Sequence, residues 1–228
     1  ARPMIERLSG DRVRHELNHI LTSRFAPQIF ARLDELELLK AIHPGLAWDD
    51  WLYARIEALP ALDPGPEWEL EGDRSLVRQQ LGYLLLLINL PRETADGVAH
   101  RLKLPVELAE AVRQAGELWQ ERRSLVGLTP GQATRRLEDL APLARCAVYL
   151  ASSDAQLKGV LREYAMRWRH VHARVDGFAL KRMGIPPGPA YRRILGELRR
   201  AWLDGELSTP EDEQAQLERL IQAEAAGQ

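Results

Sequence analysis

Apolar residues recur along the whole chain three and four positions apart, which is the spacing of amphipathic helices. The densest of these stretches runs from 76 to 88 and predicts a central core helix. A serine, Ser9, precedes the first stretch and can cap the exposed amides of a helix start. Alternation of β-branched residues at every second position is absent, so no sheet is expected. The pattern predicts an all-α protein, a compact multi-helix array of roughly ten to twelve helices.

Proline and glycine divide these helical segments. Thr129 and Thr209 each precede a proline, which joins an N-cap residue to a first-turn proline. Residues 60–74 are acidic and rich in proline and glycine, and form the best candidate for an internal linker. We predict a helical, RNA-binding body subdomain over 1–150 and a helical tail subdomain over 151–228.

Composition narrows the class of protein. The 228 residues are 45% hydrophobic, 6% aromatic and 28% charged, which is typical of a soluble, helix-rich protein. The single cysteine, Cys146, excludes an internal disulfide and suits the reducing cytoplasm. The chain does not open on a secretory leader, and its longest apolar run is about half the roughly 20 residues that a membrane helix needs. We therefore expect a cytoplasmic protein that does not contact a membrane.

Charge is unevenly distributed along the chain. The total is only -2, but ten basic and three acidic residues give the span 160–202 a net charge of +7, which leaves -9 for the rest. Such asymmetry is typical of a protein that presents a basic face to nucleic acid.

A rigid turn, Gly184–Pro189, lies inside this basic span and begins a helix. Its prolines fix φ near roughly -65°, Gly188 can adopt a backbone conformation closed to other residues, and Pro189 falls at a first helical position. The free amides of the helix start and its positive dipole end would together accept a phosphate. The simpler alternative is a helix connector with solvated cations. The neighbouring cations are Lys181, Arg182, Arg192 and Arg193.

No catalytic constellation is recognisable. Glycine-rich phosphate loops, HExxH and GxSxG are absent, and Cys146 lies in an apolar run that favours a buried thiol. Several His and acidic pairs are of residue types that bind metals, but their spacing or their expected place at helix starts favours ordinary surface roles. We predict neither catalytic nor metal-binding residues. These pairs are His15 and His19, His170 and His172, Asp34 and Glu35, Asp49 and Asp50, and Glu211 and Asp212.

Five aromatic residues near the basic span could stack on unpaired bases. Tyr164 and Trp202 fall on apolar faces, which favours core packing. Tyr191 stays open between packing and binding, because it follows the turn directly among arginines. The remaining two are Trp168 and Phe178.

The tail of the chain resembles bacterial tRNA nucleotidyltransferases, the CCA-adding and A-adding enzymes related to poly(A) polymerase. The resemblance rests on Gly184-Ile185-x-Pro187-Gly188-Pro189-x-Tyr191-x-x-Ile194-Leu195 and on the following Leu198-Arg199-x-Ala201-x-Leu203-Asp204-Gly205-Glu206. A second motif, Ser9-x-Asp11-Arg12-Val13-x-x-Glu16-Leu17-x-x-Ile20-Leu21, is similar to the start of the family's RNA-binding body. Two departures are Asp11, where the family has Glu, and Ala179, where many relatives carry Asp.

The resemblance implies the body and tail of such an enzyme, which hold tRNA by its phosphate backbone while an upstream head domain of the same polypeptide adds CCA or A. The nucleotide loop and acidic pair of that head do not occur here, so no cofactor is expected in this chain; Mg and ATP or CTP would bind the head. The competing hypothesis is a helical protein-interaction or regulatory domain without an RNA role. The residues expected to contact RNA are Lys181, Arg182, Gly184, Pro187, Gly188, Pro189, Tyr191, Arg192, Arg193, Arg199 and Arg200.

Overall fold

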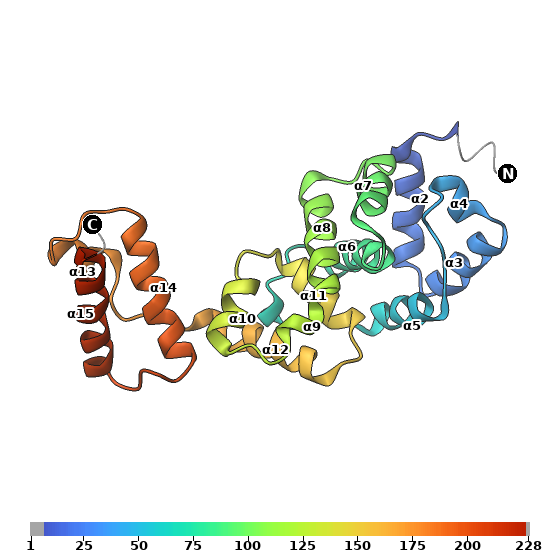
Figure 1. The fold of residues 1–228 in the computed structure, drawn as a ribbon. Helices are drawn as coiled ribbons and strands as arrows, with labels where there is room; N and C mark the ends of the chain where they lie inside the picture. Colours follow the sequence, from blue (N-terminus) through green and yellow to red (C-terminus); the bar gives the residue numbers. More distant parts are fainter. Residues whose placement is uncertain (1–6, 227–228) are drawn as a thin grey trace. The chain divides into compact units, whose positions relative to one another are not determined.

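The computed structural model describes residues 7–226, and within that range the regular structure is helical, without a strand (Figure 1). The all-α class predicted from the hydrophobic pattern is confirmed. Contacts between Cα atoms divide the chain into two compact units, which are described separately below. Unit 1 comprises residues 1–124 and 140–161, and unit 2 comprises residues 125–139 and 162–228. The functional subdivision at residue 150 stays a prediction.

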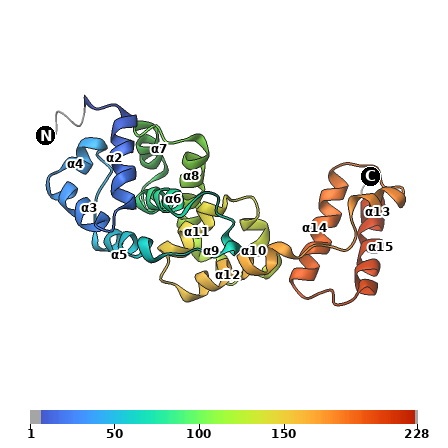
Figure 2. The ribbon, with the colours of Figure 1, turned by 180° about the vertical axis from the view of Figure 1, so that it is seen from behind.

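Unit 1 is organised around helix α6 (Arg74–Leu87), the stretch predicted as the central core helix. Its leucines at 81, 84, 85 and 87 and the following Ile88 are at most 2% exposed. Helix α6 contacts α2, α5, α8 and α11, which surround it in Figures 1 and 2. The helices and 3-10 turns of this unit are α2 (Gly10–Thr22), α3 (Ala26–Glu35), α4 (Leu38–Ile42), α5 (Asp50–Ala58), η1 (Leu59–Ala61), η2 (Pro66–Trp68), α6, α7 (Arg92–Arg101), α8 (Val106–Gln120) and α11 (Pro142–Ala151). The short α9 (Arg122–Leu125) and the longer α12 (Ala155–Met166) run across the division between the units.

Local capping explains where several of these helices begin. The Ser9 hydroxyl accepts a hydrogen bond from the amide of Arg12, which confirms the predicted cap of α2. The Asp49 carboxylate does the same for Leu52 at 2.7 Å, and the Asp73 carboxylate for Leu76 at 2.8 Å. Each cap satisfies an amide that the helix itself leaves without a partner.

Residues 60–74 were the best candidate for an internal linker, and the structure does not bear this out. This segment lies within unit 1 and contains η2, whose Trp68 is only 7% exposed. The Trp68 ring packs on Tyr149 of α11 with 4.9 Å between the ring centroids. Burial of the large Trp68 side chain attaches this segment to unit 1, although its proline and glycine content is typical of a linker.

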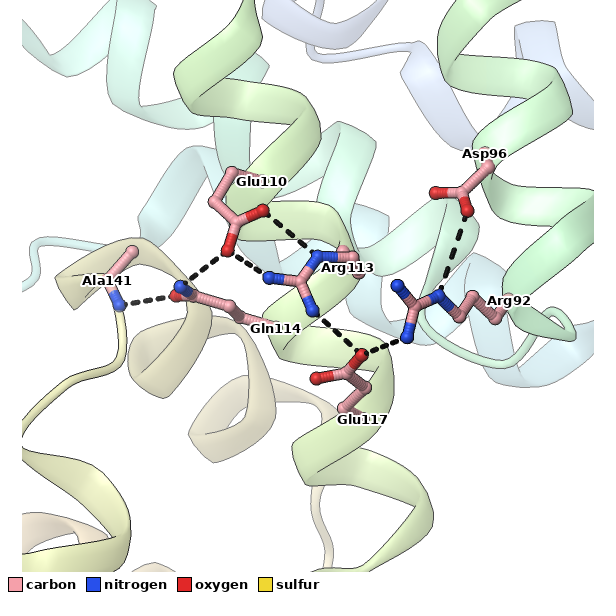
Figure 3. Close-up of polar contacts among 7 residues, drawn as sticks. All are labelled: Arg92, Asp96, Glu110, Arg113, Gln114, Glu117 and Ala141. Atoms are coloured by element: carbon pink, nitrogen blue, oxygen red, sulfur yellow. Dashed lines mark hydrogen bonds and ion pairs between the residues drawn. The ribbon is translucent and has the colours of Figure 1, made fainter.

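A polar network ties helices α7 and α8 to the start of α11 (Figure 3). Arg113 donates from Nε to Glu110 at 2.9 Å and from a terminal nitrogen to Glu117 at 2.9 Å. Glu117 also accepts from Arg92 of α7 at 2.9 Å. Gln114 bridges Glu110 and the N-cap amide of α11, at 2.9 and 2.6 Å. Because the network joins three helices, it constrains their relative positions beyond what any single exposed ion pair achieves.

Unit 2 contains α10 (Pro130–Leu137), the end of α12, η3 (Trp168–His170), α13 (Gly177–Arg182), α14 (Pro189–Leu203) and α15 (Pro210–Ala226). The last three helices are shown in Figure 1, and they share a small apolar core. Helix α10 packs on α14, and the Asp204 carboxylate accepts from the Gly131 amide at 2.7 Å. A capping box of Thr129 and Gln132 begins α10, as the Thr-Pro pattern predicted. The buried core residues are Leu180, Ile194, Leu198, Ala201, Leu207 and Leu217.

No helix among the described residues is long and apolar enough to cross a membrane.

Candidate nucleic-acid interface

The predicted turn joins α13 to α14 and contains a single left-handed residue. Gly184 has φ 83°, and its amide donates to the Lys181 carbonyl at 3.0 Å, while the Ile185 amide donates to the Leu180 carbonyl at 3.2 Å. These bonds close the C-terminus of α13 in the manner of glycine-terminated helices. Glycine is therefore required at 184 for conformational reasons.

Gly188 differs from the expectation. Its φ of 167° is extended backbone that any residue adopts, and a Cβ built there would meet nothing within 4 Å. Helix α14 begins at Pro189, as predicted, and no side chain caps this helix start. Because Pro189 lacks an N–H and Gly188 has no side chain, the Ala190 amide has no hydrogen-bond partner among the described residues. An amide of this kind at a positive helix end can receive an anion.

Tyr191 holds the turn together. Its hydroxyl donates to the Ile185 carbonyl at 2.9 Å, and its ring lies 3.4 Å from the position of a Cβ at Gly177. The side chain is half-buried against the apolar core of unit 2. These contacts give Tyr191 a structural role, and the predicted RNA contact of this residue stays a prediction.

Three of the predicted cations are exposed and unpaired. Lys181 and Arg182 lie in the last turn of α13, and Arg192 lies in the first turn of α14. No hydrogen bond or ion pair joins their side chains to another residue in the described part of the chain. Since α13 packs on α14, this end of unit 2 presents three positive charges that no carboxylate among the described residues pairs with.

The other three predicted arginines are engaged within the fold. Arg193 forms a two-pronged ion pair with Glu224 of α15, which raises the pKa of the guanidinium. Arg199 pairs with Glu138 at 2.5 Å and donates to the backbone carbonyls of residues 171 and 169 at 2.8 and 3.2 Å. Its role is to fasten η3 and the end of α10 to α14.

Arg200 is surrounded by carboxylates. It contacts Glu197 at 2.9 Å, Asp204 at 3.2 Å and Glu206 at 2.5 Å. The hydrogen bond to Glu206 is the main cause of a strongly raised pKa at Arg200, followed by the one to Glu197. One positive charge among three negative ones gives this part of α14 a negative local balance, so a phosphate would be repelled unless an acid moved away. The predicted phosphate contacts of Arg193, Arg199 and Arg200 stay predictions.

A buried carboxylate holds the backbone segment that precedes α13. It was not among the residues that sequence reasoning selected. Glu213 of α15 is 1% exposed and accepts from the amides of Val175 at 2.8 Å and Arg174 at 3.2 Å, and from the indole N–H of Trp202. It thereby fixes the segment before α13 to both α14 and α15. Its sequence neighbour Asp212 accepts from the amides of residues 208 and 209, and the first of these bonds is the main cause of its lowered pKa. Asp212 is therefore engaged at the helix start, as its position suggested.

Two of the other candidate groups can be placed in the structure. His15 and His19 lie edge to face with 3.1 Å between their Nε2 atoms, but no third ligand joins them, and the described residues contain no group of three potential ligands. Burial raises the pKa of the Cys146 thiol to about 12, with a smaller contribution from the charge of Glu67. Such a thiol is not a nucleophile near neutral pH.

Residues 1–49 match the family model described as "Probable RNA and SrmB- binding site of polymerase A". An A-adding tRNA nucleotidyltransferase of Geobacter sulfurreducens is 26% identical over 224 residues, which cover 92% of this chain and 24% of that protein. The chain thus spans about a quarter of the length of this curated relative. The family model covers the motif that begins at Ser9, one of the two on which the resemblance was based.

Solved structures show the same fold. A Thermotoga maritima CCA-adding enzyme complexed with tRNA is 19% identical with a TM-score of 0.73, over 96% of this chain and 52% of that one. A CCA-adding enzyme in complex with CTP gives the same values, and a tRNA-processing enzyme in an apo form is 18% identical with a TM-score of 0.57, over 88% and 50%. The predicted resemblance to the body and tail of tRNA nucleotidyltransferases is confirmed by these comparisons.

Proposed function

We propose that this chain is the tRNA-holding region of a tRNA nucleotidyltransferase, which grips tRNA while a head domain of the same polypeptide extends the 3′ end with CCA or A. The match of residues 1–49 to an RNA-binding family model and the similarity to an A-adding enzyme support the family assignment. The head would bring Mg and ATP or CTP, and the cytoplasm would be the place of this work.

The observation that carries the RNA-holding role is the unpaired cation group formed by Lys181, Arg182 and Arg192. These cations lie in the last turn of α13 and the first turn of α14, on either side of the turn that leads into the uncapped start of α14, and the two helices pack on each other. Phosphate oxygens are the ligands that satisfy both cationic side chains and the free amide of a helix start, and backbone contacts of this kind position a nucleic acid without reading its sequence.

Binding of fluorescein-labelled tRNA, followed by anisotropy over a range of salt concentrations, tests the proposal. Each phosphate contact should contribute roughly -0.7 to -0.9 to the slope of log K against log salt. Replacement of the three unpaired cations by Gln should weaken binding and reduce the magnitude of that slope by about 2 to 3. A single-stranded RNA of equal length tests whether binding depends on the folded shape of tRNA, and it should bind less tightly than tRNA.

A control removes the same number of charges at exposed positions elsewhere, with Arg74, Arg123 and Arg135 each changed to Gln; Arg74 forms an exposed ion pair with Asp63, which contributes little to stability. This control should bind tRNA with nearly the parent slope. Binding that ignores salt, or an equal loss in both variants, would contradict the assignment of the interface. Salt-insensitive capture of a helical peptide instead would favour the competing protein-interaction hypothesis.

A further inference from the structure

One aromatic side chain in unit 2 is left exposed without any packing role. Phe178 of α13 has 74% of its surface exposed, and no ring or cation contact to it occurs among the described residues. Three other aromatic residues of unit 2 are engaged, and Trp168 is half-buried. Tyr164 is buried, the Tyr191 hydroxyl bonds to a backbone carbonyl, and the Trp202 indole N–H bonds to Glu213.

Exposed cations follow Phe178 on the same helix, and the exposed Asp176 at the N-cap accepts a hydrogen bond from the Ala179 amide. Lys181 and Arg182 follow Phe178 by three and four residues, which puts them on the same side of α13. Both are exposed and unpaired, and Arg192 lies on the helix that α13 packs against. A protein partner that buried Phe178 in an apolar pocket would also have to desolvate these charges, which is costly without paired acids.

An unpaired base resolves this conflict, because it offers a flat π-face for the ring and carries a phosphate on each side for the cations. We propose that Phe178 stacks on an unpaired base of folded RNA, with Lys181 and Arg182 on the flanking phosphates. This inference rests on the proposed tRNA-holding function and adds to it a contact with a base, where the cations alone provide contacts with the backbone.

Three substitutions at the same exposed position separate stacking from simple apolar contact. Phe178→Ala removes the ring, Phe178→Leu keeps the apolar bulk without the flat face, and Phe178→Trp keeps and enlarges that face. Stacking on one base predicts that Ala and Leu weaken tRNA binding roughly 5- to 150-fold, while Trp retains it. The indole introduced at 178 should also lose fluorescence when tRNA binds, measured as the difference from the parent protein.

A blunt-ended RNA duplex is the matched ligand control, since it has phosphates but no unpaired base. Phe178→Ala should bind this duplex as the parent does. Unchanged tRNA affinity in Phe178→Ala, full affinity in Phe178→Leu, or an equal loss on the duplex would each overturn the inference.

The two proposals fail in different ways. If the parent chain binds tRNA in a salt-dependent manner and Phe178→Ala binds equally well, the stacking contact is wrong and the holding function stands. If the parent chain does not bind tRNA even at low salt, the holding function is refuted and the stacking contact falls with it. Far-UV circular dichroism checks that each variant keeps the parent helicity, which we expect because Phe178 contributes nothing to the core.

Discussion

The buried carboxylate of Glu213 provides the sharpest test of how unit 2 holds its exposed surface. It accepts three hydrogen bonds, two from the backbone before α13 and one from Trp202. Replacement by Ala removes both acceptor oxygens and with them all three hydrogen bonds. Each donor that stays buried without a partner costs about 1–3 kcal/mol, so the free energy of unfolding of unit 2 should fall by at least about 3 kcal/mol.

Replacement of Glu213 by Gln separates the charge from the shape. The amide fills the same volume but offers one acceptor oxygen in place of two, and its NH2 group faces a backbone donor. We expect a smaller loss, about 1–3 kcal/mol, since one or two of the three bonds persist. Glu211→Gln is the control, because Glu211 is exposed in the first turn of the same helix. This substitution should change the free energy of unfolding by less than about 0.5 kcal/mol.

Urea unfolding followed by circular dichroism measures these losses, and hydrogen exchange of the amides of Arg174 and Val175 locates them. In the parent protein both amides should exchange slowly, and in Glu213→Ala they should exchange far faster while α6 of unit 1 keeps its protection. Equal protection in parent and Ala variant, or a stability change below about 0.5 kcal/mol, would refute the role given to Glu213.

Two other predictions concern substitutions of single residues. Cys146 should resist thiol reagents at pH 8 until the protein unfolds. Burial raises the pKa of the folded thiol to about 12, so the thiol of the unfolded chain ionises first as the pH rises, and the free energy of unfolding should fall between about pH 9 and 12. The Cys146→Ser variant is the control and should lose this part of the alkaline dependence. Gly184→Ala should destabilise the protein by about 1–2 kcal/mol in thermal unfolding because of its positive φ, whereas Gly188→Ala should be neutral or up to about 1 kcal/mol stabilising; equal effects at both positions would contradict the backbone assignment of the turn.

Much of the helical fold could be predicted because its signals are local. The caps at Ser9, Asp49 and Thr129 act within three residues of the helix starts they satisfy. Likewise the apolar stripe of α6 predicted the helix that lies at the centre of unit 1. In each case the residues that determine the structure are neighbours in sequence, so periodicity and capping rules suffice.

Contacts between distant residues could not be predicted in this way. The linker interpretation of residues 60–74 failed because the Trp68 ring packs on Tyr149, which lies beyond helices α6 to α10 along the chain. The burial of Glu213 could not be predicted from the sequence, because an acidic residue in the first turn of a helix is ordinarily explained by its favourable interaction with the helix dipole. Its burial depends on the indole of Trp202 and on a loop almost forty residues earlier.

Ion pairs between distant residues likewise could not be predicted from the sequence. These pairs determine which cations are available to bind a polyanion. The window 160–202 carries +7 by count, but Glu138, Asp204, Glu206 and Glu224 lie outside it and neutralise Arg193, Arg199 and Arg200. Helix α14 is therefore divided: near its start Arg192 is free to meet a ligand, and near its end the arginines hold the fold. A long, unbroken basic stripe would bind any polyanion, whereas Lys181 and Arg182 at the end of α13 and Arg192 at the start of α14 favour a ligand that reaches that end of unit 2. Stability and RNA affinity should accordingly respond to different arginines of one helix.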